Sequence, residues 1–175
     1  NYFRPVKKIF YPLQVLWAWW YLVVFMFTLL LLYPLFYLWL SKVKWYPKAN
    51  RLRRVWAWLF LLLTGVSYSI RHESRLNKKQ NYIFCSNHFS YLDIPLFTMC
   101  FKGNYRFMAK AELGNIPLFN IFFRTIDIAV NRSSRTESVK ALLEAGECLT
   151  NGDHLIIFPE GKIGHNPPHH PPHLE

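Results

Sequence analysis

The longest apolar run of the chain covers residues 15–40, which are 26 residues without one charged side chain. As a helix this run is about 39 Å long at 1.5 Å per residue, and the hydrocarbon core of a bilayer is roughly 30 Å thick. Tryptophans near both ends suit the membrane interface, and Pro34 predicts a kink. The pattern therefore predicts a tilted transmembrane helix rather than a soluble core helix or a cleaved signal peptide.

A second apolar run covers residues 55–70 and has 16 uncharged residues. It is short for a span, so it predicts an interfacial or re-entrant helix packed against the first. Between the two runs lie six basic residues, which are expected to meet anionic lipid headgroups or to form a solvated linker near the membrane. They are Lys42, Lys44, Lys48, Arg51, Arg53 and Arg54.

After about residue 71 the pattern changes to short apolar segments that alternate with polar helical stretches. This alternation predicts an α/β domain in which helices cover a sheet. Ser134 and Glu137 fit a capping box before the clearest helix, and Gly152 fits the end of that helix. The predicted strands are 82–86, 105–109, 126–131 and 154–158, and the predicted helices are 93–101, 118–124 and 138–150.

The charge distribution favours a membrane over a nucleic acid as the partner of this basic chain. The 175 residues include 21 Lys+Arg and 10 Asp+Glu, but residues 1–54 carry nine basic residues and no acidic one. These charges flank the apolar run and are more numerous after it. The positive-inside rule therefore predicts an integral membrane protein with the following domain on the cytoplasmic face. The three cysteines lack metal-ligand spacing, which predicts reduced, mostly buried thiols and no metal.

The first predicted strand, an apolar run expected to be buried, ends on the segment that carries His88 and Asp93. An imidazole accepts a proton near neutral pH, and a carboxylate on its other nitrogen fixes the tautomer. No serine or cysteine nucleophile is required if the substrate brings a hydroxyl, so neither Ser90 nor Cys85 is favoured as one. The alternative is a loop histidine beside a helix-capping aspartate.

The other predicted strands also end on charged residues. If the strands are parallel, these ends converge on one edge of the sheet, where cations suit a phosphate group. A base beside a phosphate site, below a membrane anchor, points to a phospholipid or its precursor. The alternatives are solvated lysines, an ion pair between Arg132 and Glu160, and a turn cap by Glu160. The charged residues concerned are Lys110, Arg132, Glu160 and Lys162.

Three motifs in order resemble the phospholipid/glycerol acyltransferases, and within them the 1-acyl-sn-glycerol-3-phosphate acyltransferase branch. They are Asn87-His88-x4-Asp93, a middle motif over residues 107–133, and Phe158-Pro159-Glu160-Gly161. The resemblance implies a mixed sheet covered by helices, as in the glycerol-3-phosphate acyltransferases. It also implies acyl transfer to a lysophosphatidate-type acceptor from acyl-CoA or acyl carrier protein as co-substrate, with no further cofactor.

The resemblance also assigns roles to residues. His88 is the general base and Asp93 is its partner. The residues assigned to substrate binding are Asn87, Lys110, Arg132, Glu160 and Gly161.

Two features depart from the family pattern. Lys162-Ile163 stands where the family commonly has Thr-Arg, and the chain ends in a Pro/His-rich tail where relatives continue. We therefore expect a membrane-anchoring segment over 1–70, an acyltransferase domain over 71–164 that is C-terminally incomplete, and a tail over 165–175. The alternative function is a membrane-anchored lipid-binding protein without turnover, and a weaker one is metal binding by the histidine tract.

Overall fold

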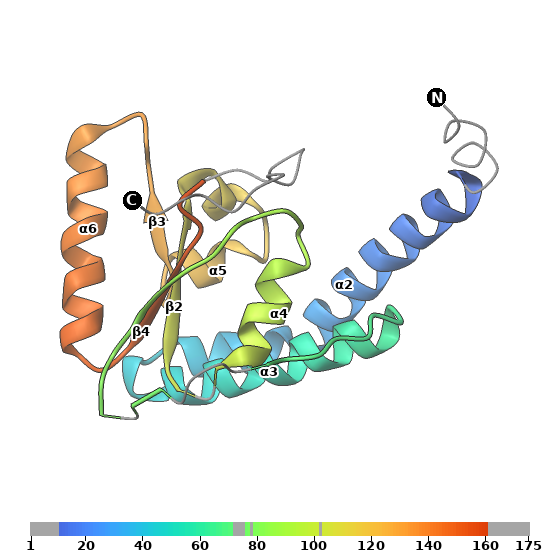
Figure 1. Ribbon diagram of the computed structural model, residues 1–175, viewed down its shortest axis with the longest axis horizontal. Coiled ribbons are helices and arrows are strands. Elements are labelled where there is room, and N and C mark those ends of the chain that lie inside the picture. The colour runs from blue at the N-terminus through green and yellow to red at the C-terminus, as the bar shows by residue number, and fades with distance from the viewer. Residues whose placement is uncertain (1–10, 72–75, 78, 102, 161–175) are drawn as a thin grey trace.

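The N-terminal part of the protein is an antiparallel helical hairpin (Figure 1). The structure, a computed structural model, describes residues 11–71, 76–77, 79–101 and 103–160. Helix α2 (Tyr11–Leu40) is followed by the short helix η1 (Val43–Trp45) and by α3 (Tyr46–Leu63). The indoles of Trp17 and Trp20 donate to the carbonyls of Thr64 and Leu63, at 3.2 and 2.9 Å. These bonds join the early turns of α2 to the end of α3.

Helix α2 confirms the predicted long apolar helix and begins four residues earlier than predicted. Within the described ranges it is the one helix long and apolar enough to cross a membrane. The structure corrects the second prediction, because α3 begins at Tyr46 rather than at residue 55 and ends at Leu63. The helix therefore includes basic residues that were expected to lie in a linker, and one of them, Arg53, is buried.

Four strands form a sheet in the order β1-β4-β2-β3. All three pairings in the described part of the chain are parallel, so the mixed sheet implied by the resemblance is not found there. Each strand lies where the sequence predicts one, and both of its ends are within two residues of the predicted ends. The strands are β1 (Ile83–Cys85), β2 (Tyr105–Lys110), β3 (Ile128–Val130) and β4 (His154–Ile157).

Helices cover both faces of the sheet (Figure 1). Helix α6 (Arg135–Thr150) lies on one face and buries Ala141 and Ala145 against Leu155 of β4. Helix α4 (Asp93–Cys100) lies on the other face, together with the aromatic cluster around Phe107. The short helices η2 (Ala111–Asn115) and α5 (Asn120–Phe123) connect β2 to β3. The sheet thus forms the middle layer of an α/β domain.

The ends of α6 follow the predicted capping signals, and the helix begins three residues earlier than the predicted range of 138–150. Ser134 is the N-cap, and its hydroxyl accepts the backbone N–H of Glu137 at 3.3 Å. At the other end Gly152 has a φ of +94°, and the N–H groups of Gly152 and Asp153 donate to the carbonyls of Leu149 and Cys148. This pair of bonds is the Schellman motif, in which glycine accepts the left-handed conformation without strain.

Strand β1 lies at an edge of the sheet, which overturns the expectation of a buried strand. Ile83 and Cys85 point to the face that α6 covers over β4, but α6 packs on β3 and β4 and leaves β1 uncovered. Ile83 is therefore 51% exposed, and Cys85 is exposed rather than part of the core. Only Phe84, on the opposite face, packs against the aromatic cluster. The apolar run alone did not distinguish an edge strand from a central one.

A buried ion pair joins the hairpin to the sheet. The guanidinium of Arg53 on α3 donates to both carboxylate oxygens of Asp127, just before β3, and both side chains are 6% exposed. Asp127 also accepts the backbone N–H of Phe107 on β2 at 3.0 Å. Arg54 donates to the carbonyl of Phe101 at 3.1 Å. These two arginines therefore bind protein groups, contrary to the expectation that they meet lipid headgroups.

Candidate active site

The loop between β1 and α4 is folded around the carboxylate of Asp93. One oxygen of that carboxylate, Oδ2, lies 3.0 Å from Nδ1 of His88. The same oxygen accepts the backbone N–H groups of Phe89 and Ser90 at 2.8 and 2.9 Å. Asp93 is the first residue of α4, where the unpaired N–H groups of a helix favour a negative charge. The predicted pair is therefore brought together by a turn that the aspartate itself organises.

This geometry determines which nitrogen of His88 can act as a base. An ionised carboxylate only accepts hydrogen bonds, so the proton of a neutral imidazole is assigned to Nδ1. Nε2 then carries the lone pair that can accept a proton. The side chains of His88 and Asp93 are 14% and 21% exposed, so the pair is largely desolvated but still reachable. The alternative of a helix-capping aspartate is not found, because the N-cap of α4 is Leu92 and the Asp93 carboxylate accepts amides of the preceding loop.

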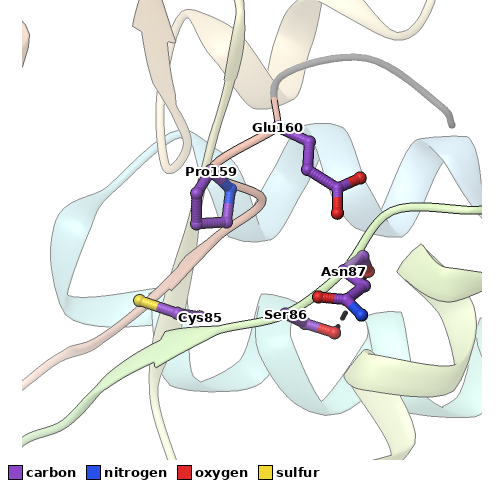
Figure 2. A pocket seen from close by; sticks show the side chains of 5 residues that line it. All are labelled: Cys85, Ser86, Asn87, Pro159 and Glu160. Carbon is purple, nitrogen blue, oxygen red and sulfur yellow. Dashed lines mark hydrogen bonds between the residues drawn. The ribbon is translucent and has the colours of Figure 1, made fainter. Parts of the chain in front are cut away.

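Glu160 connects the loop after β4 to the loop that holds His88. Its Oε2 accepts the backbone N–H of His88 at 3.3 Å. Beside this contact is a small pocket of about 160 Å³, shown in Figure 2, where the side chains of Asn87 and Glu160 lie near each other. Cys85, Ser86 and Pro159 complete its lining. Two of the predicted substrate-binding residues thus lie together next to the loop of His88.

The ring of Phe158 covers one face of the His88 imidazole. The two ring centroids are 4.4 Å apart and the planes are inclined by 26°. Phe158 was part of a recognised motif but was given no role from the sequence. The signal that could have found it is its position directly after β4 and two residues before Glu160.

The predicted phosphate-binding cations occupy the ends of β2 and β3. Lys110 pairs with Glu112 at 2.9 Å, and both side chains are more than half exposed. Arg132 is exposed. The hydrogen bond from Lys110, with smaller contributions from its charge and that of Arg132, lowers the pKa of Glu112 below its usual value. Glu112 belongs to the polar residues that follow this predicted strand, but no sequence pattern assigned it a role.

The remaining candidates named from the sequence have separate outcomes. The Ser90 hydroxyl accepts the backbone N–H of Leu92 at 3.1 Å, so it serves the turn. No ion pair between Arg132 and Glu160 occurs in the described part of the chain. Gly161 and Lys162 lie outside the described residues, as does the histidine tract. Within residues 11–71, 76–77, 79–101 and 103–160, no group of three or more His, Cys, Asp or Glu side chains could hold a metal ion.

The chain matches a known protein family. The acyltransferase family matches residues 67–174, which is more than half of the chain. The chain belongs to the acyltransferase family. The match includes the loop of His88 and Asp93 and all four strands, so the family's domain is the α/β domain described above.

Three individual relatives are 24–30% identical to parts of this chain. A 1-acyl-sn-glycerol-3-phosphate acyltransferase of Borreliella burgdorferi is 30% identical over 102 residues, 58% of this chain and 41% of the relative. A Caenorhabditis elegans protein provisionally given the same activity is 29% identical over 99 residues, 55% of this chain and 38% of the relative. A lyso-ornithine lipid O-acyltransferase of Rhizobium meliloti is 24% identical over 119 residues, 67% of this chain and 37% of the relative.

The matched segments thus cover about two fifths of these relatives' own length. No solved structure matches the chain.

Proposed function

We propose that this protein transfers a fatty acyl group from acyl-CoA or acyl carrier protein to the free hydroxyl of a lysophosphatidate-type lysolipid. The observation that carries the proposal is the 3.0 Å contact between Nδ1 of His88 and Oδ2 of Asp93, in a member of the acyltransferase family. This contact leaves Nε2 as the basic atom. A general base of this kind contributes about 10²–10⁴-fold to the rate of proton transfer from a hydroxyl.

The reaction proceeds without a covalent enzyme intermediate. Nε2 of His88 takes the proton of the acceptor hydroxyl while the hydroxyl oxygen attacks the thioester carbonyl carbon. The tetrahedral intermediate collapses, the carbon–sulfur bond breaks, and the leaving thiolate takes the proton from Nε2. Asp93 stays ionised throughout and stabilises the imidazolium that forms between the two steps.

The oxyanion of the intermediate needs hydrogen-bond donors. The N–H groups of Phe89 and Ser90 are already donated to Asp93, and that of His88 is donated to Glu160. Using any of them would undo the geometry of the base. We therefore expect the oxyanion donors to come from outside these three amides.

The charged residues at the strand ends favour one headgroup for the acceptor. Exposed Arg132 and Lys110 favour a phosphate, because a guanidinium binds phosphate oxygens in pairs and an ammonium adds a point charge. Two relatives are named for a glycerol-phosphate acceptor and one for an ornithine lipid. The cations support the first of these acceptors for this chain.

An acyl-transfer assay with a panel of lysolipids tests the proposal. The acceptors are 1-acylglycerol-3-phosphate, lyso-ornithine lipid and 1-acylglycerol, each combined with acyl-CoA and with acyl carrier protein. We expect the fastest turnover with the phosphorylated acceptor. Binding of all lysolipids without consumption of either thioester would contradict the proposal and support a lipid-binding protein.

The phosphate role is tested by Arg132→Met with Lys140→Met as the matched control. Lys140 is an exposed cation on α6, so its removal changes the net charge equally without changing the strand ends. We expect Arg132→Met to raise KM for 1-acylglycerol-3-phosphate about tenfold, the effect of losing a charged hydrogen bond, and to leave KM for 1-acylglycerol unchanged. Equal effects on both acceptors would remove Arg132 from the phosphate site.

We further propose that α2 and α3 enter the membrane together as a hairpin within one leaflet. Apolar side chains are exposed along α2, and four basic residues near the hairpin turn are exposed. Tyr21, Val24 and Phe25 of α2 share a packed cluster with Phe60 of α3 and with Leu96 and Met99 of α4. A full crossing by α2 would place the helix that begins with Asp93 in hydrocarbon, where polar groups are costly. The exposed basic residues are Lys42, Lys44, Lys48 and Arg51.

Single cysteines at Tyr11 and Ser41 distinguish the hairpin from a span. The two positions lie at opposite ends of α2 and are exposed. In a background without the three native cysteines, each variant is reconstituted in sealed vesicles and treated with an impermeant maleimide. Insertion in one leaflet predicts labelling of both from the same side of the membrane. Labelling from opposite sides would show that α2 crosses the bilayer.

A further inference from the structure

The contact between Phe158 and His88 follows from the register of two parallel strands. Cys85 of β1 is paired with Ile157 of β4. Phe158 directly follows Ile157, and His88 lies three residues beyond Cys85. The rings meet where the two strands end, with centroids 4.4 Å apart and planes inclined by 26°. The aromatic residue and the base are therefore fixed to each other by the sheet.

Phe158 is itself held from its other side. Phe97 of α4 meets it edge-on, with centroids 5.6 Å apart and planes at 82°. Phe158 also packs against the buried cluster that contains Phe107 and Ile156. Helix α4 begins with Asp93, so one short helix supplies both the carboxylate for Nδ1 of His88 and the brace for the ring that covers the imidazole.

We propose that Phe158 is a positioning residue that keeps Nε2 of His88 directed at the acceptor hydroxyl, an inference that rests on the proposed function. The hydrogen bond to Asp93 fixes one ring atom and leaves the imidazole free to tilt about it. The stacked ring removes this tilt. Aromatic pairs contribute about 0.5–1.5 kcal/mol beyond their buried area, and a ring face also attracts the imidazolium that forms during transfer.

Three variants separate this role from ordinary packing. Phe158→Leu keeps an apolar side chain of moderate size and removes the ring, whereas Phe158→Tyr keeps the ring. Phe101→Leu is the matched control, because Phe101 belongs to the same cluster and packs on Phe97 and Phe84 instead. Each variant is measured in lysolipid acylation at one pH, together with its melting temperature.

For Phe158→Leu we expect a fall in kcat of about 3- to 10-fold, the size of a lost aromatic pair, with the acceptor KM changed less than twofold. Phe158→Tyr should stay within twofold of the wild type in kcat. Phe101→Leu should lower the melting temperature at least as much as Phe158→Leu and leave kcat within twofold. Equal values of kcat for Phe158→Leu and Phe101→Leu, or a fall in Phe158→Tyr equal to that in Phe158→Leu, would overturn the proposal.

A second readout does not depend on activity. A ring stacked at 4.4 Å shifts the carbon-bound proton resonances of the His88 imidazole upfield in the NMR spectrum. His88→Gln identifies these resonances by their loss. We expect the upfield shift in the wild type and Phe158→Tyr and its loss in Phe158→Leu; an unchanged shift in Phe158→Leu would contradict the stack. If the wild type lacks acyl transfer, the proposed function fails, whereas the NMR result still decides the placement of Phe158.

Discussion

Two aspartates in this protein each bind a basic side chain and backbone N–H groups, but the two pairs differ in their burial and in their basic partner. Asp127 binds Arg53 and the N–H of Phe107, whereas Asp93 binds His88 and two loop amides. The first pair is 6% exposed on both sides, and the second is 14% and 21% exposed.

The basic partner decides the difference between these pairs. Arginine stays charged at physiological pH, so its buried pair with Asp127 can join elements but cannot accept a proton. A neutral histidine has a lone pair on its second ring nitrogen, so its pair with Asp93 can also take part in proton transfer.

Breaking the buried pair should give the largest change in stability. Arg53→Met leaves Asp127 buried without its cation, which costs about 3–5 kcal/mol in the free energy of unfolding. The double variant Arg53→Met/Asp127→Asn removes the buried charge and keeps an acceptor for Phe107, so it should recover most of that loss. Denaturant unfolding in detergent measures both variants.

Arg51→Met is the matched control for this prediction, since Arg51 lies on the same helix and is exposed. It should change the free energy of unfolding by less than about 0.5 kcal/mol. A cost for Arg53→Met as small as that of Arg51→Met would mean that the pair does not hold the hairpin to the sheet.

Altering the second pair should affect turnover rather than folding. In Asp93→Asn the amide oxygen takes the position of Oδ2, because only an acceptor there can bind both loop amides and Nδ1–H of His88. The neutral amide stabilises the imidazolium that forms during proton transfer less than a carboxylate does, so kcat should fall by about 10²-fold. The melting temperature, followed in the same preparation, should change little. Retention of most of the activity would argue against stabilisation of the imidazolium by the Asp93 carboxylate.

The pair of Lys110 and Glu112 is exposed, unlike the two pairs above, and its removal should have the smallest effect on stability and turnover. Both side chains are more than half exposed, and such pairs contribute about 0–1 kcal/mol. Glu112→Gln should leave stability unchanged and release Lys110 and Arg132 from a competing carboxylate. We expect KM for 1-acylglycerol-3-phosphate to fall about twofold. A rise in KM would instead indicate that Glu112 orients Lys110 for the acceptor.

Most of the secondary structure could be predicted from the sequence because it depends on local patterns. The capped helix α6 and the strand ends that carry His88, Lys110 and Arg132 lie where their signals place them. The exposure of β1 could not be predicted, because it depends on where α6 packs. The start of α3 was missed because the first half of this helix is basic. A run of basic residues is also typical of a solvated linker, and the pattern does not reveal that one face of the helix packs on the domain.

The buried Arg53 and the ring of Phe158 were missed for a related reason. Each gains its role from a partner far along the chain, Asp127 for the first and His88 for the second. Asp127, a lone charge within an apolar segment, was the available signal for the ion pair. The local pair His88–Asp93, five residues apart, could be predicted because its geometry is set within a single turn.

We propose that His88 acts as the base, whereas Asp127 and Arg53 only hold the fold. The two roles are separated by the rate of acyl transfer to 1-acylglycerol-3-phosphate by His88→Ala, measured beside His154→Gln, a histidine change at the start of β4. We expect a loss of about 10²–10⁴-fold for His88→Ala with an unchanged melting temperature, and near wild-type turnover for His154→Gln. Near-normal acyl transfer by folded His88→Ala would contradict the proposal.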